Sequence, residues 1–396
     1  MPIINLKEER ACKEGFLTHY LAYAQPQEAP DDFHTWVAIG LIGSTLARNC
    51  WLDRGFGKLY ANLYIVLVGE SALERKTVAL QMGVNLLRRA LSTDINFFAQ
   101  KITPESFMNF LAKIYEKKKV SEAIIHASEF SVFLGKAKID PAILALLTDL
   151  YDTPDIWDYS TIVRGNETCN NACINMLAGT TPEWLKLSLP EEAIGGGFYS
   201  RLLLIYRSGN KKRNPHPEDD LLTPEAQALF SSCENDLRII RNMHGPFSWI
   251  KQAKQMYDDW YYEYNMPSEA PPYLRGYFGR KGSTIIKLAM ISSASCEDSK
   301  KIRPTDIMWA INILEENELH LKGIVNFLGM TEEGKKAERV LYLIRKAGQI
   351  SHSVLLQNVS HQLNRDELRL VLDTLLESKQ IEKFYDGSKY YYKFVG

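Results

Sequence analysis

The sequence predicts an α/β protein, and three observations support that prediction. Short runs of β-forming residues lie at 63–68, 96–100, 122–127, 173–179 and 201–206. Amphipathic helical patterns separate several of them, at 76–90, 104–116 and 141–150. Strands that alternate with helices form parallel βαβ units. In addition, the first strand ends in a glycine and leads into a helix, which is the outline of a phosphate-binding loop.

Composition narrows the class of protein. The chain has 396 residues, 45% of them apolar and 24% charged, so it can build two or three folded cores. The formal net charge is −1, so the whole molecule does not attract nucleic acid, and a DNA partner would need a local basic patch. The segment "MPIINLKEER" lacks a signal core, and no run approaches the length of a membrane helix. We expect an intracellular, cytoplasmic protein without a membrane partner.

Cysteine usage argues against a zinc site. Only Cys169 and Cys173 are close in sequence, and no second pair accompanies them. Reduced thiols are the simpler interpretation. The six cysteines are Cys12, Cys50, Cys169, Cys173, Cys233 and Cys296.

Four segments are predicted. Residues 1–60 form a helical segment, with "EGFLTHYLAYA" as one helix and "FHTWVAIGLIGSTLARNCWL" as a second, capped by Asp32. Residues 61–207 form the α/β region. The polar stretch "RSGNKKRNPHPEDD" opens the third segment, 208–330, which has helical periodicity and few strand signals.

The fourth segment, 331–396, has the element order of a winged helix. Helices are expected at 335–346, 353–359 and 364–378, and a hairpin turns at "DGS". Asn364 and Glu367 make a capping box for the third helix. That helix carries charges of both signs, so the hairpin lysines, Lys389 among them, are the better candidates for DNA contact. Docking of another protein is the alternative role.

The stretch "NLYIVLVGESALERKTVAL" (62–80) carries the phosphate-loop prediction. A buried strand delivers a small-residue loop, Lys76 would reach the β- and γ-phosphates, and Thr77 would hold Mg²⁺. Five residues separate Gly69 from Arg75-Lys76, and Arg75 stands where a second glycine is usual. A positive φ there would fall on a costlier residue. A strand–turn–helix with an incidental lysine is the alternative. The predicted nucleotide-binding residues are Gly69, Glu70, Ser71, Arg75, Lys76, Thr77 and Val78.

Two later strands end in polar side chains that fit the same chemistry. "EAIIHASEF" ends in Ser128-Glu129, where Glu129 would polarise the attacking water and Ser128 would contact Mg²⁺ through a water. "CINMLAGTTPEWL" ends in Thr180-Thr181-Pro182, where a polar residue would sense the γ-phosphate or orient the attacking water, and Thr181 before Pro182 also begins a helix. An exposed glutamate and an ordinary helix cap are the alternatives.

Two arginines have a position that fits contact with phosphate or nucleic acid. Arg201 opens the strand after "GGGFYS", and an arginine at a subunit edge can complete a neighbour's ATP site. "DYSTIVRGNETCNN" (158–171) reads as a hairpin turning at Gly165-Asn166, with Arg164 near its tip. In a ring, such tips would line the channel and grip a DNA backbone. Surface arginines are the alternative.

The order of these features resembles the AAA+ ATPases. Within them it is most similar to a family of phages and mobile elements related to the minichromosome maintenance (MCM) helicases. The resemblance covers roughly residues 15–325 and rests on the lead-in to the first strand, "RKT", "AGTTPEWL" and "GGGFYSR". "GYFGRKGSTIIKLAMI" (276–291) is similar to the lid helix with its sensor arginine, which makes Arg280 that residue, and "RPTDIMWAINIL" is similar to the next lid helix.

The resemblance implies an AAA+ P-loop core with a parallel sheet, an all-α lid, an N-terminal helical lead-in packed on the core and a C-terminal winged helix. It implies ATP and Mg²⁺ as cofactors, a hexameric ring, and action on DNA in replication, with a replication protein as a partner of the winged helix. Glu129, Thr181, Arg201 and Arg280 take the catalytic roles. The family's inserted hairpin has no room between residues 78 and 120. Two alternatives stay open: a nucleotide-gated switch without unwinding, and an inactive scaffold.

Overall fold

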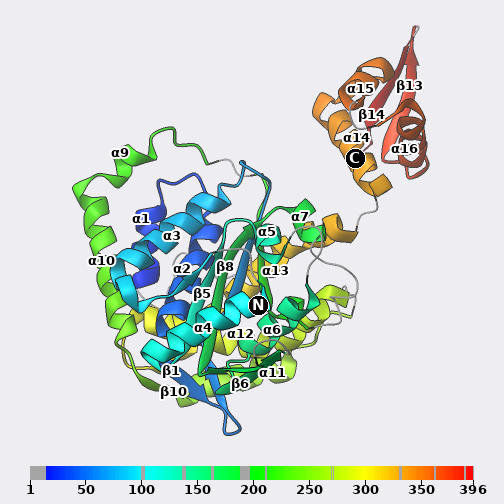
Figure 1. Ribbon diagram of the computed structural model, residues 1–396. Helices are drawn as coiled ribbons and strands as arrows, with labels where there is room; N and C mark the ends of the chain where they lie inside the picture. Colours follow the sequence, from blue (N-terminus) through cyan, green and yellow to red (C-terminus); the bar gives the residue numbers. More distant parts are fainter. Residues whose placement is uncertain are drawn as a thin grey trace. The chain divides into compact units, whose positions relative to one another are not determined.

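The computed structural model describes two compact units, divided between Lys322 and Gly323 (Figure 1). The boundary falls inside α13 (Pro304–Gly329), near the end of the predicted third segment. The described residues are 15–99, 103–135, 140–161, 165–187, 197–209, 212–268, 270, 272–329, 332–360, 363–387 and 389–395.

A five-stranded parallel sheet forms the centre of the first unit, so the predicted α/β class is confirmed. All four pairings between neighbours are parallel. In spatial order the strands are β4 (Phe97–Phe98), β5 (Ser121–Ala127), β8 (Ala172–Thr180), β3 (Tyr64–Val68) and β9 (Leu202–Tyr206). Each corresponds to a predicted strand, with ends shifted by no more than two residues.

The strand order reverses between β3 and β8. From β3 the chain runs through α3 (Lys76–Leu91) to β4 at one edge of the sheet, whereas from β8 it runs to β9 at the other edge. In open α/β sheets, ligands bind at such a switch point, outside the carboxyl ends of the strands. Every residue of β3 is buried, as expected for a central parallel strand. The loop that follows Val68 therefore lies where an α/β sheet of this order is expected to bind a ligand.

Several helices accompany the sheet, and one hairpin lies beside it. They are α4 (Pro104–Lys118), α5 (Phe130–Leu134), α6 (Pro141–Tyr151), α7 (Pro182–Leu187) and the hairpin β6 (Ile156–Thr161) and β7 (Gly165–Asn170). The predicted turn at Gly165-Asn166 is wrong, because Gly165 already pairs with Thr161. The predicted tip residue, Arg164, lies outside the described residues.

The N-terminal helices α1 (Phe16–Ala24) and α2 (Asp31–Leu46) pack on the core. A Cβ added at Gly40 would lie 2.5 Å from a methyl carbon of Leu177, so the glycine lets α2 lie close against β8. The predicted cap, Asp32, is inside the helix rather than before it. The predicted extension of this helix through "NCWL" is also wrong, because Ala47 adopts a left-handed φ of 42° and ends it.

A second, four-stranded sheet was not predicted. Its strands are short, and apart from the hairpin β1–β2 they pair across large sequence distances, as in the pairing of Cys50 with Gly245, so local patterns do not reveal the sheet. In spatial order they are β11 (Lys301–Ile302), β10 (Gly245–Trp249), β1 (Cys50–Asp53) and β2 (Lys58–Tyr60).

The remaining segment of the first unit is helical, as the periodicity of 221–330 predicts. Buried residues of this segment join one continuous hydrophobic core with α1, α2, α3 and the central sheet. The helices, besides α13, are α9 (Pro217–Leu221), α10 (Pro224–Arg241), α11 (Lys251–Glu263) and α12 (Pro272–Cys296). Within the described ranges, no helix combines the length and the hydrophobicity needed to cross a membrane.

The second unit has its own hydrophobic core. The capping box of Asn364 and Glu367 is confirmed, and so is the C-terminal hairpin. The strand β12 was not predicted, and it completes a sheet of order β12-β14-β13. The elements are α14 (Glu332–Ala347), β12 (Gln349–Ser351), α15 (His352–Val359), α16 (Arg365–Glu377), β13 (Ile381–Asp386) and β14 (Lys389–Phe394).

Candidate nucleotide site

The loop between β3 and α3 lies at the carboxyl end of the sheet. Arg75, the residue before α3, adopts the left-handed conformation with φ 49° and ψ 28°. The positive φ expected at the position of the missing glycine is therefore present, on an arginine. Ala72 has a second positive φ, of 61°. Ala72 and Arg75 therefore adopt positive φ angles in a loop whose usual pattern has a glycine for this purpose.

Glu74 turns inward in this loop, and its side chain is only 1% exposed. A Cβ added at Gly69 would lie 2.8 Å from Cγ of Glu74 and 3.2 Å from the carbonyl oxygen of Arg207. Only glycine fits between those two groups. A larger residue at position 69 would therefore force Glu74 to move, and the sequence analysis gave Glu74 no role.

Lys76 opens α3, and its side chain is buried. Its Nζ donates hydrogen bonds to the carbonyl oxygens of Gly69 (2.7 Å) and Glu70 (3.0 Å). Burial lowers the pKa of Lys76, while the nearby carboxylates of Glu129 and Glu74 favour its charged form. The loop is closed around its own lysine, so a phosphate would have to take the place of these two carbonyl groups.

The other predicted loop residues are at the surface. The side chains of Glu70, Ser71, Arg75, Thr77 and Val78 are all exposed. Thr77 lies in the first turn of a 16-residue helix, where unpaired backbone N–H groups and the helix dipole favour an anion. This is where the hydroxyl that would hold Mg²⁺ is expected.

Glu129 follows β5 and contacts the neighbouring strand β8. Its Oε1 accepts hydrogen bonds from Oγ1 of Thr180 (2.8 Å) and Oγ of Ser131 (3.0 Å). Ser128 is exposed beside it. A Cβ added at Gly179 would lie 3.2 Å from the carbonyl oxygen of Ser128 and 3.8 Å from Cβ of Lys76. The sheet therefore brings the lysine loop and the end of β5 together across β8.

Thr181 has a different contact from its neighbour Thr180. Its Oγ1 accepts a hydrogen bond from the backbone N–H of Trp184 (3.3 Å), which makes it the cap of α7. The sequence prediction selected Thr181, and the structure shows that the buried Thr180 is the threonine that touches Glu129.

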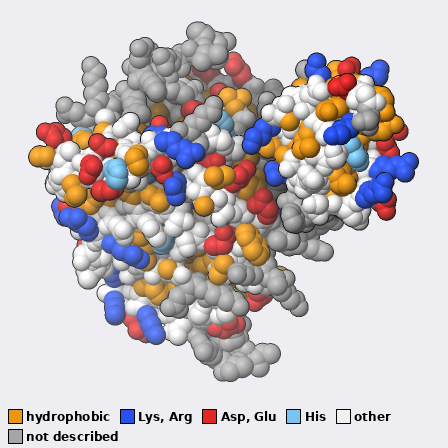
Figure 2. All heavy atoms as spheres, turned by 90° about the horizontal axis from the view of Figure 1, so that it is seen from above, with side chains coloured by type: hydrophobic (Ala, Val, Ile, Leu, Met, Phe, Trp, Pro, Cys, Tyr) orange, Lys and Arg blue, Asp and Glu red, His pale blue; other side chains and the backbone are white. Residues whose placement is uncertain are grey.

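Ion pairs connect this end of the sheet to the turn between α1 and α2 and to the first turn of α2. All three acids come from residues 28–32, and the sequence analysis assigned none of them a role in the site. Figure 2 looks onto this end of the unit and shows acidic and basic side chains interspersed on its described surface. The pairs are Arg75–Glu28, Arg207–Asp32 and Lys212–Asp31.

Arg201 lies at the opposite, amino end of the sheet. It is the last residue of a short 3₁₀ helix (Tyr199–Arg201), not the first residue of β9 as predicted, and it is only 8% exposed. Its guanidinium donates to a carboxylate oxygen of Asp152 (2.5 Å) and to the carbonyl oxygen of Gly197 (2.9 Å). A five-residue strand spans about 17 Å, so Arg201 and Lys76 do not meet within one chain.

Arg280 joins Arg201 at this end. Its Nε donates to Oγ of Ser200 (3.2 Å), and its guanidinium lies 3.5 Å from the carboxylate of Asp152. A Cβ added at Gly276 would lie 2.3 Å from Cβ of Ser200, so this glycine lets α12 approach closely. The two predicted arginines therefore share one carboxylate, Asp152, which the sequence analysis did not select.

A buried lysine lies near this cluster. Lys287, on α12, donates from Nζ to the backbone oxygen (2.8 Å) and the side-chain oxygen (2.9 Å) of Asn62. Its Nζ also lies 4.0 Å from the ring centre of Tyr151. Burial lowers the pKa of Lys287 to about 7.

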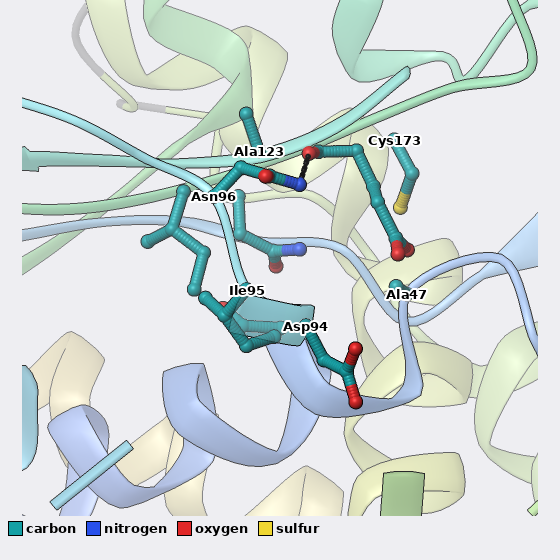
Figure 3. Close-up of a pocket in the computed structure, with 10 residues that line it drawn as sticks. Ala47, Asp94, Ile95, Asn96, Ala123 and Cys173 are labelled. Carbon is teal, nitrogen blue, oxygen red and sulfur yellow. Dashed lines mark hydrogen bonds between the residues drawn. The ribbon is translucent and has the colours of Figure 1, made fainter. Parts of the chain in front are cut away.

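One small cavity lies on the sheet but away from the phosphate loop (Figure 3). Its volume is about 10 Å³, the space of about one water molecule. Asn96 points across it and donates to the backbone oxygen of Glu122 (3.0 Å). The cavity is a packing feature and too small for a nucleotide.

The predicted DNA-contacting residue of the second unit, Lys389, is exposed at the start of β14 and pairs across the hairpin with Asp386. Beside it, Nζ of Lys383 lies 4.3 Å from the ring centre of Tyr390. The hairpin thus presents lysines and tyrosines together.

Comparison with known proteins adds no family assignment, since neither the protein-family models nor the curated proteins searched contain a match to this chain.

Proposed function

We propose that the chain is a phosphate-loop ATPase of the AAA+ class that assembles into a ring and acts on DNA. The observation that carries the proposal is the convergence of Lys76, Glu129 and Thr180 at the carboxyl end of one parallel sheet. They come from three strands or their loops, at the point where strand order reverses. This is where an α/β sheet binds a ligand.

Each residue has a role that suits its chemistry. Lys76 binds the β- and γ-phosphates of ATP, and Thr77 holds Mg²⁺, with Ser128 near a metal-bound water. Glu129 polarises the attacking water. Thr180 holds the Glu129 carboxylate through a 2.8 Å hydrogen bond, while Thr181 remains the second candidate for sensing the γ-phosphate.

Arg201 and Arg280 act on the nucleotide of an adjacent subunit. Their support is geometric, because both lie at the amino end of the sheet, remote from their own Lys76. A site completed in this way needs a neighbour with the same orientation, and repetition of that head-to-tail contact closes a ring. We propose a hexamer on the basis of the resemblance to AAA+ proteins.

The proposal of DNA as partner rests on the second unit. The order helix, strand, two helices and hairpin in residues 332–394 supports the proposal of a winged helix, and Lys389 lies exposed on its hairpin. A replication protein is the second candidate partner of this unit.

A nucleotide-gated switch without strand separation is the alternative function. The closed loop favours it, because Lys76 is bonded to the loop's own carbonyl groups and Glu74 is buried within the loop. Opening that loop would couple nucleotide binding to a conformational change.

Three measurements on the full chain test these proposals. We expect ATP hydrolysis that DNA accelerates, a mass increase to a closed oligomer with a non-hydrolysable ATP analogue, and displacement of a labelled strand. Oligomers without hydrolysis-driven displacement would favour the switch. A chain that neither binds nor hydrolyses ATP would exclude both functions and leave an inactive scaffold.

A further inference from the structure

An open groove of about 660 Å³ lies between the hairpin β1–β2, the base of the hairpin β6–β7 and the end of α4. Figure 1 shows β1 and β6 together at the end of the unit opposite α9. The groove is separate from the nucleotide site. Its lining residues are Arg48, Trp51, Lys58, Tyr60, Tyr115, Val120, Asp155, Ile156, Asn170 and Asn171.

Three aromatic rings in the groove each carry a cation over one face. The distances from cation to ring centre are 4.4 Å for Lys58 over Trp51, 4.6 Å for Arg48 over Tyr60 and 5.6 Å for Lys119 over Tyr115. The groove thus alternates positive charge with flat apolar surface. Single-stranded nucleic acid has the complementary pattern, in which phosphates alternate with bases that stack on aromatic rings.

The cations differ in what else they contact. Arg48 is fixed, because it donates to the carbonyl oxygens of Thr153, Pro154 and Ala172. Lys58 and Lys119 are exposed. Lys119 ends the run "KKK" at residues 117–119, a basic segment that the nucleotide site does not use. The lysines are therefore the side chains able to bind an incoming phosphate.

Asp155 is the one carboxylate among the lining residues. It pairs with Arg48, and its side chain is 79% exposed. An exposed carboxylate in a groove for a polyanion weakens binding by repulsion. Removal of the Asp155 charge should therefore increase the affinity for nucleic acid. A misfolded variant would bind less tightly, so misfolding cannot produce this result.

We propose that this groove binds single-stranded DNA, with phosphates on Lys58 and Lys119 and bases stacked against Trp51 and Tyr115. Duplex DNA keeps its base faces covered, so the aromatic lining favours a single strand. The inference rests on the proposed action on DNA and locates it at a surface outside the ATP site and outside the second unit.

The test is fluorescence anisotropy of a labelled oligothymidine with the full chain over a range of salt concentrations. We expect Asp155→Asn to tighten binding about threefold to tenfold at low salt. The matched control is Asp219→Asn, which makes the same charge change at an exposed residue of α9 and should leave affinity unchanged.

Two further variants separate charge from stacking. Lys58→Ala should weaken binding and reduce the slope of log affinity against log salt concentration by about 0.7. Lys58→Arg should keep the wild-type affinity and the wild-type slope. Trp51→Leu should weaken binding about tenfold or more with the slope unchanged. Equal affinity of Asp155→Asn and the wild type, or an unchanged salt slope for Lys58→Ala, would overturn the proposal.

Competition and hydrolysis complete the design. If polyglutamate competes as well as oligothymidine, the occupant is an acidic protein segment and the DNA assignment is wrong. ATP hydrolysis is measured on the same preparations. If the wild type hydrolyses ATP but the groove variants bind DNA with wild-type affinity, the groove proposal is wrong and the ATPase proposal stands. If DNA affinity changes in the variants as predicted but the protein does not hydrolyse ATP, the ATPase proposal is wrong and the groove proposal stands.

Discussion

The carboxyl end of the central sheet and its amino end carry different chemistry. At the carboxyl end, a loop, a lysine and a carboxylate converge, and the hydroxyl of Thr180 orients Glu129. At the amino end, two arginines share the carboxylate of Asp152. The first set suits the binding of a phosphate chain and the activation of water, whereas the second set suits the stabilisation of negative charge.

Under the proposed function, the difference means that one chain holds two separate parts of an ATP site. Parallel strands keep their two ends about 17 Å apart, so Lys76 and Arg201 cannot act on one phosphate within a chain. If both act in hydrolysis, two chains must meet end to end. The following predictions test that conclusion, starting with the largest effect.

Lys76→Ala should abolish ATP hydrolysis and weaken ATP binding, because it removes the only side-chain cation proposed to bind the phosphates at the carboxyl end. Steady-state phosphate release and binding of a fluorescent ATP analogue measure the two effects. Lys254→Ala, a change at an exposed lysine of α11 that has no proposed role, is the control for altered charge. Hydrolysis at the wild-type rate in Lys76→Ala would show that the loop is not the site.

Arg201→Ala should lower hydrolysis about 10³-fold or more, as loss of an arginine finger does, while ATP binding persists. The decisive measurement mixes this variant with Lys76→Ala. Each protein is inactive alone, but a mixed assembly contains some interfaces with an intact Lys76 and an intact Arg201. Recovery of activity on mixing supports a shared site, and its absence, with mixed assemblies demonstrated by mass, contradicts one.

Thr180→Val and Thr181→Val separate the two threonines of the carboxyl end. Thr180→Val frees the Glu129 carboxylate from its hydrogen bond and should lower kcat about tenfold with a small change in KM. Thr181→Val removes a helix cap and should cost about 1 kcal/mol of stability. A kcat loss confined to Thr181→Val would restore Thr181 as the sensor and remove the proposed role of Thr180.

Lys287 should give the amino end a pH-dependent stability. Its folded-state pKa is lowered to about 7, so between about pH 7 and its ordinary pKa of 10.5 the unfolded chain binds more protons. Stability contributed by this group therefore rises with pH through that window. Denaturant titrations at about pH 7 and about pH 8.5 should differ by about 1–2 kcal/mol more in the wild type than in Lys287→Met. Equal differences in both proteins would contradict this prediction.

The smallest effect concerns the left-handed Arg75. Both Arg75→Gly and Arg75→Ala lose the ion pair with Glu28, so their difference isolates the backbone conformation. Arg75→Gly should be more stable than Arg75→Ala by about 1 kcal/mol, measured by thermal unfolding. Equal stability would mean that the loop changes shape when the arginine is removed.

Much of the fold could be predicted from local patterns. The five central strands have runs of β-formers that are buried on both faces, and the helices between them have clear periodicity. The pairing of β1 with β10 escaped prediction because the two strands lie almost two hundred residues apart in the sequence. No local signal identifies such a pair.

Some residues of the candidate site could be selected from local patterns, and others could not. Gly69, Lys76 and Glu129 could be selected because each stands at the end of a predicted strand or the start of a helix. Thr180 was missed in favour of its neighbour, since the choice depends on which hydroxyl faces β5. Asp152 and Glu74 were missed because their importance lies in contacts with residues brought near by folding.

The sequence alone determined the parallel α/β class, the position of the loop between the first central strand and its helix, and the helical and hairpin order of the last segment, because hydrophobic period and turn residues are local properties. Only the tertiary structure decided which threonine meets Glu129, that two arginines from distant segments share Asp152, and that a cation-lined aromatic groove exists. These depend on strand order and helix packing, which are set by burial of the whole core and not by any one stretch of the chain.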